Sequence, residues 1–276
     1  MKHSAKITAI LLTIFILSQF IGLFIVDSYS IEKTKTIDGK EVKEIEYNDL
    51  PYDIERPDLE EGTSYIPMLI MVLLVTFFIL LIIKFNVQWL WKAWFFLSVV
   101  FCLLISFAAF LSSQLAIILS IVLSYAKIFK NNVVTQNISE LFIYGGLAAV
   151  FVPIMNLASI TIFLIIISIY DYIAVNKTKH MVKMAKSHTK LNIFPGIMIP
   201  YSKNKFAILG GGDIGLPLIF AGVVMKTYGN LAYLIPFFTA GALFYLMYIG
   251  KKNKFYPAMP FITAGCLLAY LIILII

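Results

Sequence analysis

Long apolar runs, each bounded by lysines, prolines or polar residues, dominate the chain. A run of about 18 or more apolar residues is typical of a membrane-spanning helix, because about 20 helical residues cross the hydrocarbon core. The runs predict nine spans, at residues 7–26, 66–84, 92–111, 113–129, 134–153, 157–175, 206–225, 231–250 and 256–276. The pattern therefore predicts an all-α membrane protein in which residues 1–276 form a single membrane domain, a bundle of nine transmembrane helices.

Acidic and basic residues are separated along this pattern. The segment 27–65 holds 12 of the 15 acidic residues and is interpreted as a solvated external loop. The segment 176–205 is rich in lysine, and cytoplasmic loops carry an excess of lysine. We therefore expect a multi-pass protein of the cell membrane with its N-terminus in the cytoplasm and its C-terminus outside. Reading 141–170 as one span, without a division at Pro153, would place the lysine-rich loop outside.

Composition narrows the function classes. Only 13% of the residues are charged, against roughly 25% in soluble domains, and the net charge of +7 comes from lysines at span ends. No groove-reading module appears, so no nucleic-acid partner is expected. The two cysteines, Cys102 and Cys266, lie inside apolar runs, and the three histidines lie outside the spans without an HExxH motif. No metal site or cofactor is therefore predicted.

Three acidic residues remain within the apolar part: Glu140, Asp171 and Asp213. Asp171 precedes Lys177 by six residues, and Asp213 follows Lys205 by eight. At about 1.5 Å per helical residue, both aspartates are expected roughly 9–12 Å below the cytoplasmic face, on antiparallel helices. Glu140 is expected to reach the interface at the inner end of the fifth span.

A carboxylate inside a span costs roughly 2.5–3.5 kcal/mol on insertion scales, so two at one depth indicate a function. Two close carboxylates resist joint ionisation and can share a proton, which suits the activation of water beside a peptide carbonyl. The residues alone leave alternatives open. The aspartates could each be satisfied by a neighbouring helix, they could serve a proton- or cation-coupled transporter, or the protein could be a non-catalytic scaffold.

Backbone-weakening residues surround these positions. Gly210, Gly211 and Gly212 precede Asp213, and Pro217 follows it. A helix through 206–225 would place Gly210, Asp213 and Pro217 on one face and would be weak there. The ninth span opens with Pro257-Ala258-Met259-Pro260, which is either a proline-started helix or a segment whose free backbone groups bind an extended peptide.

Three motifs in order resemble the presenilin and signal peptide peptidase superfamily of GxGD intramembrane aspartyl proteases. Its YD, GxGD and PAL motifs correspond to Tyr170-Asp171, to Gly210 through Asp213, and to Pro257-Ala258-Met259, where methionine replaces the usual leucine. The resemblance also covers the span count and the long loop between the sixth and seventh spans. It implies a presenilin-like bundle.

The resemblance further implies hydrolysis of transmembrane or signal-peptide-like protein substrates in the lipid bilayer. Asp171 and Asp213 would be the catalytic pair, Tyr170 and Gly210, Gly211 and Gly212 would shape the site, and Pro257, Ala258, Met259 and Pro260 would bind the substrate backbone. No obligate partner subunit is expected, because a single chain with no long soluble domain resembles the archaeal members, which act without partner subunits. The apolar segment 191–201 is too short to span and is expected to lie at the interface or to cover the site.

Overall fold

The computed structural model describes residues 4–37, 40–85, 87–130, 132–177, 194–202, 205–251 and 256–276. Its α-helices are α1 (Ala5–Ser28), α2 (Tyr65–Phe85), α3 (Gln88–Ala108), α4 (Ser113–Phe129), α5 (Val133–Phe151), α6 (Leu157–Asn176), α8 (Gly211–Tyr228), α9 (Ile235–Ile249) and α10 (Met259–Ile275). Two antiparallel hairpins pair β1 (Ser30–Ile37) with β2 (Lys40–Tyr47), and β3 (Gly196–Ser202) with β4 (Lys205–Gly210). The 3-10 turns η1 (Pro51–Asp53) and η2 (Gly229–Leu234) complete the described elements.

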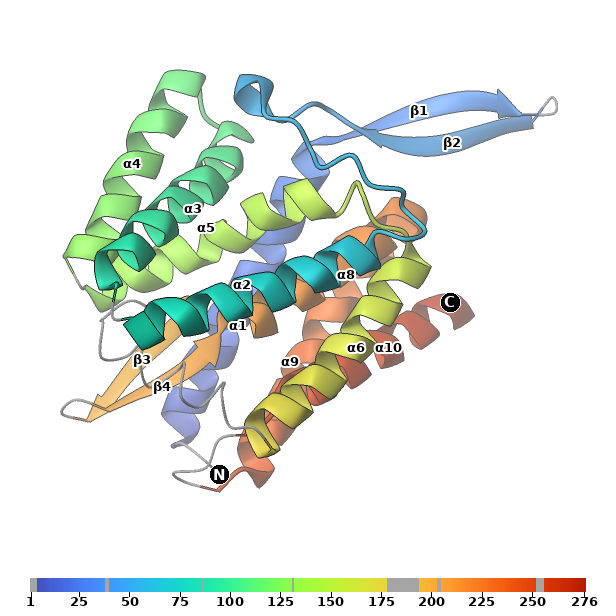
Figure 1. The fold of residues 1–276 in the computed structure, drawn as a ribbon. Coiled ribbons are helices and arrows are strands. Elements are labelled where there is room, and N and C mark those ends of the chain that lie inside the picture. The colour runs from blue at the N-terminus through green and yellow to red at the C-terminus, as the bar shows by residue number, and fades with distance from the viewer. Residues whose placement is uncertain are drawn as a thin grey trace.

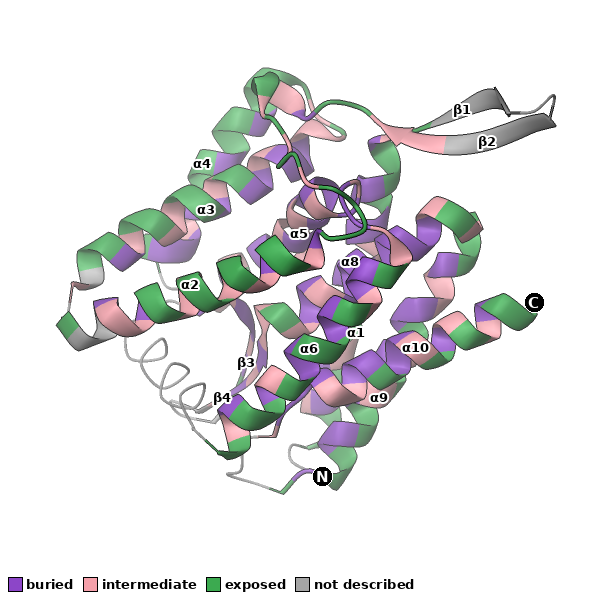
Figure 2. Cartoon of the chain, turned by 45° about the vertical axis from the view of Figure 1, so that its right-hand side comes forward, coloured by how far each residue is buried: buried purple, intermediate pink, exposed green. Residues whose placement is uncertain are grey.

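Helix α8 lies at the centre of the bundle and packs against α1, α5, α6, α9 and α10 (Figure 1). It is buried almost all round between Ile214 and Met225, as expected for a helix without a polar face. Helices α2 and α4 lie at the periphery and expose large apolar side chains such as Leu74 and Val122 (Figure 2). Exposed apolar faces on these helices suit contact with lipid.

The two hairpins lie at opposite ends of the bundle. The β3–β4 hairpin is at the end where α1 begins, whereas β1–β2 extends beyond the other end of α1 (Figure 1). The strands of β3–β4 lead directly into α8, because β4 ends at Gly210 and α8 begins at Gly211. The fold therefore places a strand-to-helix junction where the apolar pattern predicts a continuous helix in the seventh span.

Five helical stretches within the described ranges are long and apolar enough to cross a membrane: Ala5–Ser28, Tyr65–Ile82, Trp89–Ala108, Leu157–Asn176 and Gly211–Ile249. The last of these contains two predicted spans joined by η2, and Ser113–Phe129 and Met259–Ile275 are shorter apolar helices. The predicted all-α membrane class is confirmed, but the prediction of nine spans is not. Helix α5, which carries the polar residues Gln136 and Glu140, is not among these stretches.

The prediction of a solvated loop at 27–65 is wrong in part, because this segment forms a hairpin and then packs on the bundle. Leu50 is buried, and the Arg56 Nε–H donates to the carbonyl of Ala149 at 3.3 Å. The Tyr29 hydroxyl donates to the carbonyl of Ile105 at 2.7 Å. Burial raises the pKa of Tyr29 to about 12, so its hydroxyl stays protonated and holds this bond at neutral pH.

Helices α3 and α5 approach so closely at Gly146 that a side chain does not fit. A Cβ atom there would lie 1.9 Å from the backbone carbonyl oxygen of Cys102. We expect Gly146→Ala to lower the free energy of unfolding by roughly 1–3 kcal/mol, because backbone must move. Gly241→Ala, in α9, is the matched control, since a Cβ added at Gly241 would meet nothing within 4 Å. Thermal melting in detergent measures the stability of both variants. Equal melting temperatures would contradict the close contact of α3 and α5 at Gly146.

Candidate active site

Asp171 lies near the end of α6 and is only 6% exposed. The backbone N–H of Met259 donates to its Oδ2 at 3.1 Å. Met259 is the first residue of α10, so this N–H is one of the donors that a helix start leaves without an intrahelical acceptor. A carboxylate at such a helix N-terminus is electrostatically favourable. Two segments singled out in the sequence, at 170–171 and 257–260, are thus brought into direct contact.

A second bond joins the same two helices one turn further into the bundle. The hydroxyls of Ser168 and Thr263 lie 2.7 Å apart and are both buried. Pro257 and Ala258 are buried beside Met259, whereas Pro260 and Tyr170 are half-buried. This packing fixes α10 against α6 at the level of Asp171.

Asp213 lies in the first turn of α8, directly after the β4 strand. The prediction of one helix across 206–225 is therefore wrong at its beginning, because residues 205–210 pair with β3 as a strand. Gly210 has extended backbone, with ψ of 151°, and does not share a helix face with Asp213 and Pro217. The helical rise behind the predicted depth of Asp213 does not apply to residues 205–210, since a strand rises about 3.3 Å per residue. Gly210 still lies next to Asp213: a Cβ on it would be 3.3 Å from Oδ2.

The hydrogen-bond ladder of the hairpin continues onto the start of α8. The Gly211 N–H donates to the carbonyl of Pro195 at 3.0 Å. A Cβ added to Gly211 would lie 2.8 Å from the Tyr144 hydroxyl. Only glycine therefore fits here without displacing the Tyr144 side chain. A Cβ on Gly212, by contrast, would meet nothing within 4 Å. The two adjacent glycines thus have different surroundings, one against α5 and one open.

Helices α6, α8 and α10 pack against one another in pairs. Each of them carries one of the three motifs, so the tertiary structure gathers the elements that the sequence spacing singled out. Helix α1 also contacts this region, because the Gln19 amide donates to the carbonyl of Ile214 at 2.8 Å. Gln19 was not among the predicted site residues, although an amide inside an otherwise apolar span was a signal for it.

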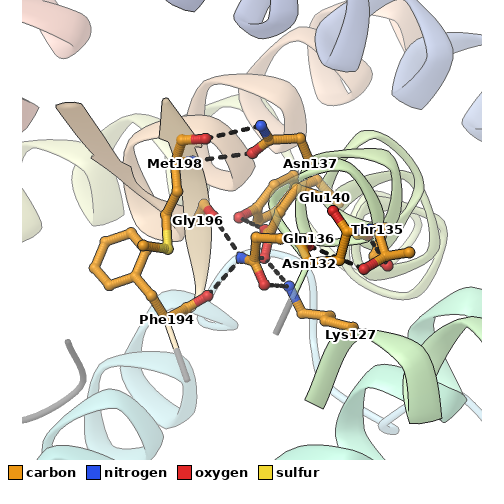
Figure 3. A network of polar contacts seen from close by, with 11 residues as sticks. Lys127, Asn132, Thr135, Gln136, Asn137, Glu140, Phe194, Gly196 and Met198 are labelled. Atoms are coloured by element: carbon orange, nitrogen blue, oxygen red, sulfur yellow. Dashed lines mark hydrogen bonds and ion pairs between the residues drawn. The ribbon is translucent and has the colours of Figure 1, made fainter. Parts of the chain in front are cut away.

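A buried polar network on α5 borders the hairpin (Figure 3). Glu140 is 1% exposed and forms an ion pair with Lys127 of α4. The expectation that Glu140 reaches the interface is therefore wrong, because a buried lysine neutralises it within the bundle. Gln136 and Asn137, one turn before Glu140, bind the backbone of the hairpin. Their spacing on one helix was a signal for this network in the sequence.

The second half of the apolar segment 191–201 lies in strand β3, which begins at Gly196 and is hydrogen-bonded to Asn137 of α5. Residues 191–193 and most of the lysine-rich loop, at 178–193, lie outside the described residues.

Two solved structures, both of "a presenilin family intramembrane aspartate protease", share this fold. The form in space group P2 superposes with a TM-score of 0.65 at 14% identity, covering 96% of both chains. The form in space group C222 gives a TM-score of 0.63 at 14% identity, covering 95% of this chain and 94% of the other. No curated protein matches the sequence. The fold is therefore that of presenilin-type intramembrane proteases.

The model of the family "Signal-peptide peptidase, presenilin aspartyl protease" matches residues 42–276. The chain belongs to this family, and it is an intramembrane aspartyl protease. The predicted membership of the presenilin and signal peptide peptidase superfamily is confirmed. The transporter alternative, drawn from the same carboxylates, finds no support in these comparisons.

Proposed function

We propose that Asp171 and Asp213 are the catalytic pair of an endopeptidase that cleaves transmembrane helices or signal-peptide-like segments. The observation that carries this proposal is the anchoring of buried Asp171 by the first N–H of α10, on a helix that also packs against the helix carrying Asp213. In an aspartyl protease, acidic residues on such contacting helices are the natural candidates for the chemistry.

The proposed mechanism needs one proton shared by the two carboxyl groups. The ionised carboxylate takes a proton from water, and the oxygen of that water attacks the peptide carbonyl carbon. The protonated carboxyl group donates its proton to the carbonyl oxygen. Collapse of the tetrahedral intermediate breaks the C–N bond. The amine leaves with a proton from the pair, and one hydroxyl of the intermediate returns its proton to the pair, so that one shared proton remains. Neither a metal ion nor an organic cofactor enters this sequence.

A substrate helix must unwind before its amides can be hydrolysed, and the edge of β4 offers a partner for the extended strand. In an antiparallel pair of strands, hydrogen-bonded and non-hydrogen-bonded residue pairs alternate. Gly196 and Gly210 form a non-hydrogen-bonded pair, because the hydrogen bond beside them runs from the Gly211 N–H to the carbonyl of Pro195. By alternation, Met198 and Ile208 are also such a pair. The backbone groups of Met198 turn away from β4 and bond to Asn137, at 2.8 and 2.9 Å.

The backbone groups of Ile208 turn away from β3 by the same alternation, toward the opposite edge of the hairpin. We expect the substrate to add as a strand along this edge of β4. Residues 257–260 would bind the substrate from the side of Asp171, with Tyr170 shaping the site. The open space at Gly212, beside Asp213, suits a substrate backbone that approaches closely.

We further propose that the shorter apolar helices α4 and α10, together with α5, complete a bundle of nine spans. The lysine-rich segment 176–205 would then be cytoplasmic, as would the N-terminus and the β3–β4 end, and the C-terminus would lie outside. The protein would act without an obligate partner subunit.

Purified protein in lipid vesicles tests this function. We expect it to cleave a single-span substrate within its apolar segment, with the fragments located by mass spectrometry. A transition-state analogue of aspartyl proteases should abolish cleavage, whereas a metal chelator should not affect it. Cleavage that survives the analogue, or vesicles that transport protons or cations without cleaving any single-span or signal-peptide substrate, would refute the proposal.

A further inference from the structure

A buried ion pair lies between an outer helix and the centre of the bundle. The side chains of Lys127 and Glu140 are 1% and 2% exposed, respectively, and their charged groups are in direct contact. Helix α4, which carries Lys127, packs on α3 and α5 and lies at the periphery (Figure 1). Removing two charges from water costs several kcal/mol per ion before the pairing compensates. The contacts of this costly pair therefore indicate which parts of the molecule it holds in place.

The Lys127 ammonium fixes the orientation of a neighbouring amide. Its Nζ donates to Oε1 of Gln136 at 2.9 Å, so the NH₂ group of Gln136 must face the other way. Nε2 of that group lies 2.7 Å from the carbonyl oxygens of both Phe194 and Gly196, at the start of β3 (Figure 3). An amide whose oxygen pointed at these carbonyls would repel them. The charge on α4 and the two carbonyl oxygens thus favour the same orientation of Gln136, with its NH₂ group toward the hairpin.

The Glu140 carboxylate orients a second group toward the start of α8. It accepts hydrogen bonds from the Gln136 amide, at 3.0 Å, and from the Tyr144 hydroxyl. The Tyr144 hydroxyl is also the atom against which Gly211 packs, two residues before Asp213. One carboxylate therefore holds both the residue that binds β3 and the residue that contacts the turn after β4.

We infer that the Lys127–Glu140 pair, acting through Gln136 and Tyr144, positions strand β3 and the Gly211–Asp213 turn for hydrolysis. Lys127 and Glu140 are positioning residues in this scheme and do not touch the substrate. The inference rests on the proposed catalytic function of Asp213. It predicts that a neutral substitution on an outer helix lowers the rate of the chemical step.

The test compares kcat, KM and amide exchange in charge variants reconstituted in vesicles. Lys127→Met should lower kcat about 10- to 100-fold, because a catalytic group misplaced by about 1 Å can lose 10²-fold in rate, and it should also raise KM, because β4 of the same hairpin is the proposed substrate-binding edge. Hydrogen–deuterium exchange should become faster in residues 205–213. The double variant Lys127→Met/Glu140→Gln should recover part of kcat, since it leaves no unpaired buried carboxylate. It also keeps the inference testable if Lys127→Met alone does not fold.

Lys226→Met is the matched control at the other end of α8. Lys226 pairs with Glu61 at 3.2 Å and donates to the carbonyl of Met155 at 3.0 Å, remote from the hairpin. It should lower the melting temperature while kcat of the folded enzyme and exchange in 205–213 stay as in the wild type.

The inference is overturned if Lys127→Met and the double variant have lower melting temperatures but keep the wild-type kcat and the wild-type exchange rate in residues 205–213. The pair would then only stabilise the fold. Failure of the proposed function is a separate result. In that case Asp213→Asn would still cleave, whatever Lys127→Met does.

Discussion

We expect Asp171→Asn and Asp213→Asn each to lower the rate of peptide cleavage by at least about 10³-fold, because an amide can neither take a proton from water nor donate one to the carbonyl oxygen. Asparagine has almost the volume of aspartate, so both variants should fold. The double variant should be no slower than either single variant, since the two groups act as one unit. Initial rates on a single-span substrate in vesicles measure the loss.

Asp58→Asn is the control for this experiment, because Asp58 is an exposed aspartate in the segment after α1. It should keep the wild-type rate. Cleavage retained in either Asp171→Asn or Asp213→Asn would remove that residue from the catalytic pair. The family assignment would stand, since it comes from the match over residues 42–276.

Gly211→Ala and Gly212→Ala should differ sharply in their effects on melting temperature and kcat, although they add the same methyl group at adjacent positions. At Gly211 the Cβ would lie 2.8 Å from the Tyr144 hydroxyl and 3.3 Å from its ring, so Tyr144 or the turn must move. Such a clash costs roughly 1–3 kcal/mol, and we expect a lower melting temperature and a kcat about tenfold lower or more. At Gly212 the methyl group enters open space, so the melting temperature should not change.

Tyr144→Phe provides the internal check on this explanation. Removing the hydroxyl takes away the atom nearest to the added Cβ, so Gly211→Ala should cost less stability in the Tyr144→Phe background than in the wild type. Any effect of Gly212→Ala is expected in KM, because its methyl group would face the incoming substrate. Equal losses of stability at the two glycines would contradict the contact between Gly211 and α5.

The double-mutant comparison also separates two functions of Tyr144. The hydroxyl donates to Glu140 and limits the space at Gly211, so Tyr144→Phe alone loses one bond but relieves no clash. Its effect on kcat should therefore be smaller than that of Lys127→Met, which leaves a carboxylate unpaired.

The sequence alone determined the membrane class, most helix positions and the residues that carry the family motifs. Apolar runs predict helices in a bilayer because the backbone must satisfy its own hydrogen bonds there, and α4 has the predicted bounds, 113–129. The aspartates stood out because charge inside an apolar run is costly. These signals are local in the chain, so they could be read without knowledge of the fold.

Only the tertiary structure decided how those residues are held. The run at 206–210 is as apolar as a helix, and only its pairing with β3 made it a strand. Glu140 was misplaced because its partner, Lys127, lies on another helix. The bond from Met259 to Asp171 likewise joins residues 88 positions apart. Strand pairing, burial of ion pairs and helix-end contacts depend on neighbours that are distant in sequence, and an apolar pattern records only that a residue is buried, not what it meets.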